Sequence, residues 1–292
     1  MKKLFYLSVI LLLAVFSSCG GKTPQTEKNT ALNVMTFNIR YDAAGDSLNN
    51  WKYRKDVAAK LIKANDADIV GTQEVLLNQL NDLKERLPEY NAVGVGREDG
   101  KEEGEFCALF YKKDKFEEVK SGNFWLSETP DVPGSLGWDA ACKRVATWAV
   151  QKDKVTGKQF IAINTHLDHV GVVARKEGGD LMLKRAGELG KQLPVVLTGD
   201  FNVTPESETV KNITDTTKEF YLVDSRNIAA KTEGTDWTYH DFGRLPEDKR
   251  ELIDYIFVSK DITVSDYKVL PEKTDDIFTS DHKAVLANIT IK

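Results

Sequence analysis

The stretch Val195-Val196-Leu197-Thr198-Gly199-Asp200-Phe201-Asn202 places a short apolar run directly before an aspartate and an asparagine. A continuous aliphatic run bounded by a turn residue is typical of a strand buried on both faces. In an extended segment, positions 200 and 202 lie on the same face, so their side chains would point the same way. The stretch therefore predicts a buried strand that ends in polar side chains.

The same pattern recurs along the chain. We expect further short strands at 32–37, 68–71, 108–111, 145–150, 160–164, 252–258 and 284–291, with 195–198 as the strand quoted above. Helical spacing of apolar residues predicts helices at 54–65, 79–87 and 174–189. Strands outnumber helices and no linker is long and low in complexity. We therefore predict an α/β domain with two sheets packed face to face and helices outside.

The composition is that of an acidic globular protein. The 292 residues carry a formal net charge of −5, with 41% hydrophobic and 29% charged residues, which excludes disordered and collagen-like chains. The acidic balance argues against a broad nucleic-acid surface, because phosphate contact needs clustered Lys and Arg. Three cysteines without zinc-ligand spacing exclude a zinc finger and a disulfide framework. We expect Cys107 and Cys142 to be buried free thiols.

The first residues indicate targeting. Lys2 and Lys3 precede an apolar run at 4–16, which is too short to span a bilayer and is typical of a signal peptide. Small residues then precede Cys19, and this arrangement resembles a bacterial lipoprotein signal, in which the cysteine is lipidated and becomes the new N-terminus.

We accordingly expect residues 1–18 to be a signal peptide, 20–30 a tether and 31–292 a single domain. The expected location is the periplasmic or cell-surface side of a membrane, reached only through the lipid on Cys19. A cleaved secretory peptide that releases a soluble protein is the alternative. We expect a monomer.

Polar residues fall at the ends of the predicted strands. Taken singly, each is ordinary: Asn or Asp at a strand end is usually turn chemistry, and a His there is usually a hydrogen-bonded core residue. Asp254 is harder to dismiss, because a carboxylate within the apolar run 252–258 needs a partner. Together, the polar residues at the strand ends are of the types that bind a metal ion and transfer protons in a metal-assisted hydrolase. The set comprises Asn38, Glu74, His166, Asp200, Asn202, Asp254, Asp281 and His282.

This ordered set resembles the endonuclease/exonuclease/phosphatase superfamily, which has the fold of deoxyribonuclease I. The resemblance runs from about residue 32 to 292. Within the superfamily, the chain resembles an exported bacterial branch related to the nocturnin-type group. Three motifs carry this similarity: Asn-Ile-Arg-Tyr-Asp at 38–42, Phe-Trp-Leu-Ser-Glu at 124–128 and Asn-Thr-His-Leu-Asp-His at 164–169. It implies a four-layer α/β/β/α sandwich with the active site at one end of the sheets. It also implies a divalent metal, Mg²⁺ with Mn²⁺ as a substitute.

The resemblance assigns roles to the strand-end residues. Glu74 is the main metal ligand, Asn38 assists it, and Asp281 completes the metal or water network. Asp200 orients or deprotonates the attacking water, and Asn202 holds a phosphoryl oxygen. His282 contacts the scissile phosphate or takes a proton, with Asp254 against its ring. That pairing would raise the pKa of His282.

Further residues complete the expected site. His166 binds phosphate or assists the leaving group, and Glu105 lies beside it. Arg144 clamps phosphate through its planar fork, with a surface arginine as the alternative. Arg40, His169 and Trp138 are also expected at the substrate. His169 could instead join a second metal or cap its loop.

We therefore expect a Mg²⁺-dependent hydrolase of phosphate esters, of phosphodiesterase or nuclease type, in which an activated water attacks in line. The alternatives are a phosphomonoesterase acting on a sugar or inositol phosphate and a non-catalytic binding module on the same fold. Short nucleic acid stays open as a substrate.

Overall fold

Strand β1 (Thr30–Asn38) runs through the middle of the first of two large sheets. The computed structural model describes Met1 and residues 28–292, so the predicted signal peptide, Cys19 and most of the tether lie outside the described residues. β1 pairs in parallel with β2 (Ile69–Gln73) and antiparallel with β15 (Val285–Ile291). The full strand order of this sheet is β10 (Lys231–Glu233), β12 (Thr263–Val269), β15, β1, β2, β4 (Leu109–Lys112) and β3 (Tyr90–Val93).

The second sheet packs against the first. Its order is β5 (Phe116–Trp125), β6 (Val145–Asp153), β7 (Gln159–His166), β8 (Val195–Asp200), β11 (Asp254–Val258) and β9 (Val223–Asp224). β7 and β8 are parallel, and β11 is antiparallel to β8. A separate small hairpin joins β13 (Lys273–Thr274) and β14 (Ile277–Phe278).

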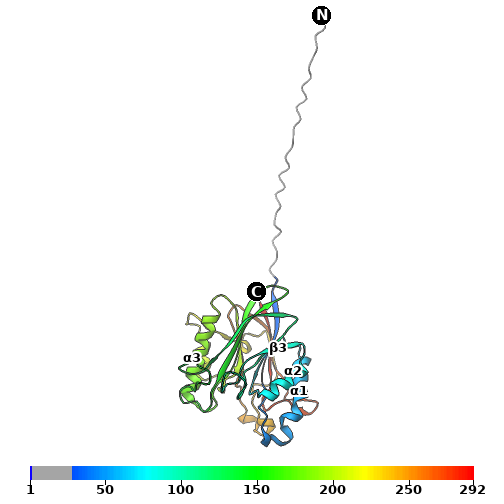
Figure 1. Ribbon diagram of the computed structural model, residues 1–292, viewed down its shortest axis with the longest axis vertical. Helices are drawn as coiled ribbons and strands as arrows, with labels where there is room; N and C mark the ends of the chain where they lie inside the picture. The colour runs from blue at the N-terminus through cyan, green and yellow to red at the C-terminus, as the bar shows by residue number, and fades with distance from the viewer. Residues whose placement is uncertain (2–27) are drawn as a thin grey trace.

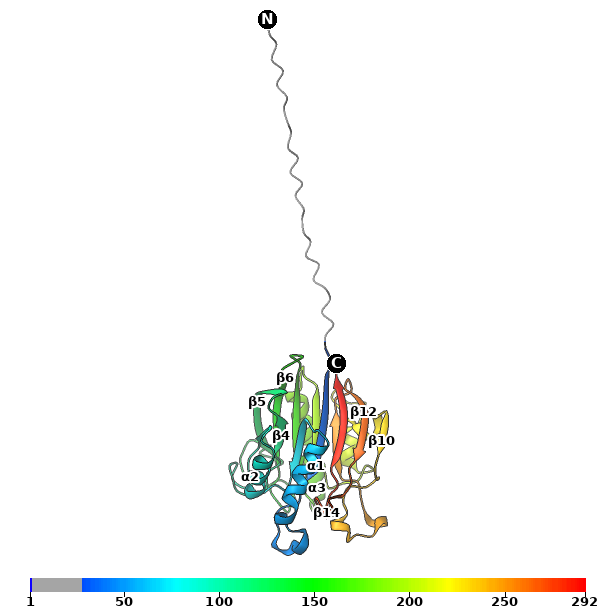
Figure 2. The same ribbon diagram turned by 90° about the vertical axis from the view of Figure 1, so that its right-hand side faces the viewer.

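Helices cover both outer faces of this pair of sheets (Figures 1 and 2). α1 (Trp51–Ala64) and α2 (Leu77–Arg86) pack on the first sheet, where Leu83 and Phe37 belong to one apolar cluster. α3 (Val172–Leu189) and α4 (Glu208–Ile213) pack on the second sheet, where Met182 and Ile163 share another. α5 (Ser225–Ile228) is a short turn beside β11. The predicted α/β/β/α sandwich is confirmed.

A third apolar cluster fills the space between the sheets. It takes Leu32 and Val34 from β1 and Ala162 and Val196 from the second sheet. Because the central strands are buried on both faces, they read as continuous apolar runs, which explains why the sequence revealed them.

The inner face of each central strand changes character along its length. In β7 it presents Phe160 and Ala162 first and then Asn164 and His166. The strand register aligns this change across the sheet, because His166 pairs with Asp200 and Asp200 pairs with Asp254. The sandwich therefore has an apolar end and a polar end, and the polar end holds the site.

The sequence prediction missed strands β3, β5, β9, β10 and β12, the hairpin of β13 and β14, and the short helices α4 and α5. β5 and β12 have polar residues at most exposed positions, and β10 and β9 have only three and two residues, so none of them forms an apolar run. Among the described helices, none is long and apolar enough to cross a bilayer.

Candidate active site

The polar end of the sandwich opens into a cavity of about 630 Å³. Its lining comes from the carboxyl ends of β1, β2, β7 and β8 and from the loops 94–108, 126–144 and 234–253. It contains most of the side chains expected from the sequence: Arg40, Glu74, Glu105, Arg144, His166, His169, Asp200, Asn202, Asp281 and His282.

Asn38 joins two carboxylates at the base of the cavity. Its amide nitrogen donates to Glu74 Oε1 at 3.0 Å and to Asp200 Oδ2 at 2.9 Å, and its oxygen accepts from the backbone N–H of Arg40 at 2.9 Å. Because the oxygen is already used by the backbone, Asn38 acts here as a bridge between the carboxylates. The role of Asn38 as a metal ligand that assists Glu74 stays a prediction.

Negative charge accumulates around this bridge. Burial raises the pKa of Asp200 to about 7, and the Asp254 carboxylate adds to the rise. Burial also raises the pKa of Asp281, with Glu74 as a further cause. Arg40 offsets part of the charge, since its Nε lies 3.1 Å from Asp46 Oδ2 and 3.7 Å from Asp281 Oδ2. Arg40 thus lines the cavity but is already paired with acids.

This acidic group fits a hard divalent cation. Glu74, Asp200 and His282 each place one ligand atom within 4.8 Å of the others. Carboxylate oxygens are the ligands that Mg²⁺ and Mn²⁺ prefer. The raised pKa values of Asp200 and Asp281 indicate carboxylates whose charge lacks a sufficient counter-ion.

His282 and Asp254 form a buried pair beside this group. His282 Nδ1 donates to Asp254 Oδ2 at 2.9 Å, and Nε2 lies 3.7 Å from Asp200 Oδ2. Although burial alone would lower it, the pKa of His282 is raised to about 10 because Asp254 and Asp200 stabilise the imidazolium. His282 is therefore a cation at neutral pH, and the carboxylate within the apolar run 252–258 has the partner it required.

His166 has the opposite character. Its pKa is lowered well below the usual value, first by burial and then by the charges of Arg144 and Arg97. As a neutral ring, it accepts from Asn202 Nδ2 at 3.0 Å through Nε2. Asn202 also donates to the carbonyl of Leu167, so this amide is fixed at both contacts.

Glu105 has a different partner from the one expected. Its Oε2 lies 2.7 Å from Nη1 of Arg97, in the same loop, and His166 instead contacts Asn202 and Asp200. Glu105 and His166 share the cavity, but the predicted pairing is wrong. Spacing in the sequence gave no signal for Arg97, because it lies in an irregular loop.

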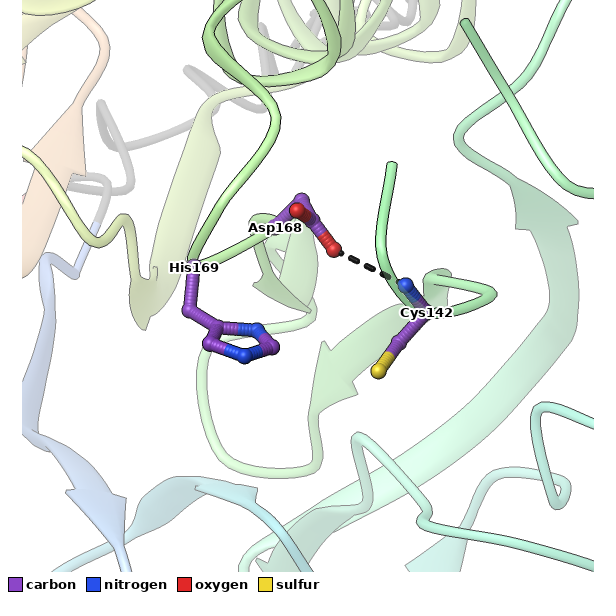
Figure 3. Close-up of side chains that lie close together, drawn as sticks. All are labelled: Cys142, Asp168 and His169. Carbon is purple, nitrogen blue, oxygen red and sulfur yellow. Dashed lines mark hydrogen bonds between the residues drawn. The ribbon is translucent and has the colours of Figure 1, made fainter. Parts of the chain in front are cut away.

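Arg144 lies at the start of β6 and is almost fully buried. Its Nε is 3.5 Å from Asp168 Oδ2, and its Nη2 donates to Nδ1 of His169 at 3.0 Å. The surface-arginine alternative is therefore wrong. Cys142, which lies beside Asp168 (Figure 3), lines the cavity and is half-buried, whereas Cys107 is buried as expected.

Trp138 does not reach the cavity. It packs against the apolar cluster beneath α3, and its backbone N–H donates to the Glu128 carboxylate. The expected substrate contact of Trp138 is absent from the cavity lining.

A layer of hydrogen-bonded polar residues supports the site from below. Gln73 donates to Asn164 Oδ1 at 2.6 Å and to Thr36 Oγ1 at 3.1 Å, and Thr198 donates to the same Asn164 oxygen at 3.1 Å. All four residues are buried between the sheets. Thr36, Asn164 and Thr198 each lie two residues before a predicted site residue, and Gln73 directly precedes Glu74. This spacing is the signal that could have identified them.

Arg54 is a second support that the sequence reasoning assigned no role. From α1 it donates to the carbonyls of Ile39 at 2.6 Å and Thr279 at 3.0 Å. These carbonyls belong to the segments that carry Arg40 and Asp281, so one buried guanidinium ties both sides of the acidic group together.

Three cavity-lining residues adopt a backbone conformation that L-residues rarely take. Arg40, Glu74 and Asn202 have φ values of 57°, 59° and 50°. Such strain costs about 1–3 kcal/mol per residue and persists where surrounding contacts impose it, most often at functional sites.

Comparisons with known proteins agree with this fold. A solved endonuclease/exonuclease/phosphatase from Bacteroides vulgatus is 49% identical with a TM-score of 0.87, covering 90% of this chain and 100% of that one. A mannosyl-6-phosphatase from Bacteroides thetaiotaomicron VPI-5482 is 39% identical with a TM-score of 0.81, covering 89% and 100%. Human nocturnin is 25% identical over 257 residues, covering 78% of this chain and 56% of nocturnin.

The family comparison extends over most of the domain. Residues 35–282 match the Endonuclease/Exonuclease/phosphatase family, a span that begins before Asn38 and ends at His282. The chain is therefore a member of the endonuclease/exonuclease/phosphatase family.

Proposed function

We propose that this protein is a divalent-metal-dependent hydrolase of phosphate esters. The observation that carries the proposal is the convergence of Glu74, Asp200 and Asp281 beside a cationic His282 and a neutral His166 in one cavity. This is the set needed to activate a water molecule and to stabilise a phosphoryl group under attack.

Glu74 and Asp281 would hold the cation, and the Asn38 amide joins Asp200 to Glu74. When bound, Mg²⁺ or Mn²⁺ would neutralise charge on the phosphoryl oxygens. Asp200 is then the residue placed to orient the attacking water and take its proton, because its Oδ2 lies 3.5 Å from His166 Nε2 and 3.7 Å from His282 Nε2 at the base of the cavity.

The two histidines act on the phosphate itself. His282, charged at neutral pH and 3.7 Å from Asp200, would stabilise the negative charge that develops as the water attacks. Asn202, whose amide donates to His166 and to the Leu167 carbonyl, would hold His166 in place at the leaving side of the phosphate. No step requires a covalent bond between protein and substrate.

The rim of the cavity favours a compact substrate over a polynucleotide. Each rim loop carries more acidic than basic residues: five against two at 94–108, three against two at 126–144 and five against three at 234–253. A phosphodiester chain crossing these loops would meet repulsion, since polynucleotide binding depends on clustered cations. We therefore rank a phosphate monoester of a sugar-like alcohol above the nuclease activity expected from the sequence.

One relative supports ranking a phosphate monoester above a nucleic acid as the substrate. The B. thetaiotaomicron protein described as a mannosyl-6-phosphatase is 39% identical, whereas the nocturnin match is 25% identical. Short RNA still belongs in the test, because several other relatives are described as exoribonuclease subunits.

The experiment is a turnover panel on the purified domain with Mg²⁺, Mn²⁺ or a chelator. Mannose 6-phosphate, 4-nitrophenyl phosphate, an inositol phosphate and a short single-stranded RNA are the substrates. We expect metal-dependent release of phosphate from the monoesters, lost in Glu74→Gln and retained in the exposed control Glu188→Gln. Absence of turnover on every ester with either metal would favour the non-catalytic binding module.

We further propose that the protein is exported, lipidated at Cys19 and monomeric. The composition of residues 1–21 supports this proposal. In the native host, Cys19→Ala should move the protein from the membrane fraction to the soluble fraction. Light scattering of the purified domain tests the monomer.

A further inference from the structure

The Arg144 guanidinium is held at two of its three nitrogens. Nε faces Asp168 Oδ2 at 3.5 Å, and Nη2 donates to His169 Nδ1 at 3.0 Å. The third nitrogen, Nη1, is buried and has no hydrogen-bond acceptor among the described residues. A buried donor without an acceptor is costly, so its presence on a cavity wall indicates that a ligand supplies the acceptor.

Asp168 fixes this guanidinium in one orientation. Its carboxylate accepts from the backbone N–H groups of Ala141, Cys142, Val170 and Gly171. Although burial alone would raise it, the pKa of Asp168 is lowered to about 2 by the N–H groups of Gly171, Val170 and Ala141 and by the charge of Arg144. The contact with Cys142 and the position of His169 beside it are visible in Figure 3. Because the anchor is rigid, Arg144 loses little further freedom when it binds a ligand.

Arg144 lies on the phosphate side of the cavity. Arg144 and His166 line the same cavity, and among charged groups Arg144 has the largest effect on the pKa of His166. Arg97 has the next largest effect. Two guanidinium groups therefore act on His166, and each of them is also paired with a carboxylate, Arg144 with Asp168 and Arg97 with Glu105.

A phosphate monoester and a phosphate diester would present different groups to Arg144. The monoester has three terminal oxygens and carries up to two negative charges. The diester has two terminal oxygens, one charge and a second ester arm. A fixed, desolvated guanidinium would bind a third charged oxygen strongly and would gain little from an ester oxygen.

We propose that Arg144 binds the third terminal oxygen of a phosphate monoester and thereby makes the site selective for monoesters over diesters. Asp168 and His169 are positioning residues for Arg144. This inference rests on the proposed phosphoesterase function and specifies its substrate class.

A metal site at the same place is the weaker interpretation. Ligand atoms of Cys142, Asp168 and His169 lie within 4.8 Å of one another. However, His169 Nδ1 already accepts from Arg144, Asp168 is saturated by backbone donors, and the guanidinium charge would repel a cation. An anion satisfies these groups, whereas a cation would have to displace one of them.

The test compares two esters with the same leaving group, 4-nitrophenyl phosphate and bis(4-nitrophenyl) phosphate. In Arg144→Ala, kcat/KM for the monoester should fall on the order of 10- to 100-fold, the range expected for one charged hydrogen bond, while the diester changes less than about threefold. Added guanidinium should restore monoester hydrolysis only. Arg185→Ala, on the outer helix α3, is the control and should leave both rates unchanged.

Equal losses on both esters, or no loss on the monoester, would overturn the proposal. His169→Gln should shift the monoester-to-diester ratio in the same direction by a smaller factor, which a merely structural residue would not do. If Arg144→Ala does not fold, Arg144→Lys, which keeps the charge without the fork, should give an intermediate ratio.

A binding measurement separates this proposal from the proposed function. Calorimetry of the Mg²⁺-loaded protein with inorganic phosphate and with dimethyl phosphate requires no turnover. We expect phosphate to bind tighter than dimethyl phosphate in the wild type and this preference to be lost in Arg144→Ala. If neither ester is hydrolysed but the preference is present, catalysis fails and the subsite stands. If both anions bind alike, the subsite fails.

Discussion

At the residue scale, the site depends on pairs of ionisable groups whose environments differ. His282 is held cationic by Asp254, while His166, facing Arg144 and Arg97, is held neutral. Two histidines in one cavity therefore present opposite hydrogen-bonding characters at neutral pH. Burial favours the neutral form of both rings, and only at His282 do the neighbouring carboxylates reverse that preference.

Replacing Asp254 with Asn should lower turnover by about 100-fold or more, because His282 would lose the charge that keeps it protonated and oriented. The measurement is kcat/KM on 4-nitrophenyl phosphate, with thermal unfolding to confirm the fold. Asp248→Asn, at an exposed carboxylate, is the control. A folded Asp254→Asn protein with turnover near wild type would leave the pair a structural role only.

The same pair predicts how stability depends on pH. The folded-state pKa of His282, about 10, lies above its usual value of 6.5, so protonation of His282 favours the folded state. This contribution is complete below pH 6.5 and is lost as the pH rises toward 10. The free energy of unfolding of the metal-free domain should therefore decline between pH 7.5 and 10. The decline should be shallower in Asp254→Asn; parallel curves would contradict the assignment.

At the element scale, the strand register aligns the chemistry. One row across β7, β8 and β11 carries His166, Asp200 and Asp254, and the row below it in β7 and β8 carries Asn164 and Thr198. The two sheets approach closely at this level. A Cβ added to Gly71 would lie 2.1 Å from Thr198 Oγ1 and 2.6 Å from Asn164 Oδ1.

Gly71→Ala should consequently destabilise the domain by about 1–3 kcal/mol, the usual cost of overpacking a tight core. Turnover should fall as well, because Thr198 and Asn164 support the catalytic row. Chemical denaturation measures the first effect. Gly45→Ala is the matched control, since nothing lies within 4 Å of the added carbon there, and a similar loss in both variants would refute the argument.

At the scale of the whole molecule, the sandwich concentrates carboxylates at one end, and a cation there should stabilise the fold. Adding Mg²⁺ or Mn²⁺ should raise the free energy of unfolding by about 2.7 kcal/mol at a concentration one hundred times the Kd. Glu74→Gln should abolish most of this gain, whereas Glu188→Gln should keep it. An unchanged melting temperature with either metal would contradict the site.

The parts of this architecture that could be predicted are those in which burial shapes the sequence. β7 and β8 are apolar on both faces, so their runs and the polar residues that follow them were readable. β5 and β12 were not readable, because one face of each meets solvent. Glu105 was predicted to pair with His166, but it forms an ion pair with Arg97. Trp138 was predicted to contact substrate, but it packs against the apolar core beneath α3. The contacts of these loop residues depend on the conformation of the loops, which the periodicity of the sequence does not predict.

The direction of β1 has a consequence for how the protein meets its substrate. The chain enters the described domain at Thr30 and reaches the cavity at Asn38, and a nine-residue strand separates these points by about 26 Å. Anything that holds the protein by its N-terminal side would therefore leave the mouth of the cavity facing away from the attachment. Molecules would reach it by diffusion through the aqueous phase, and release from a membrane should leave kcat/KM for a dissolved phosphate ester unchanged.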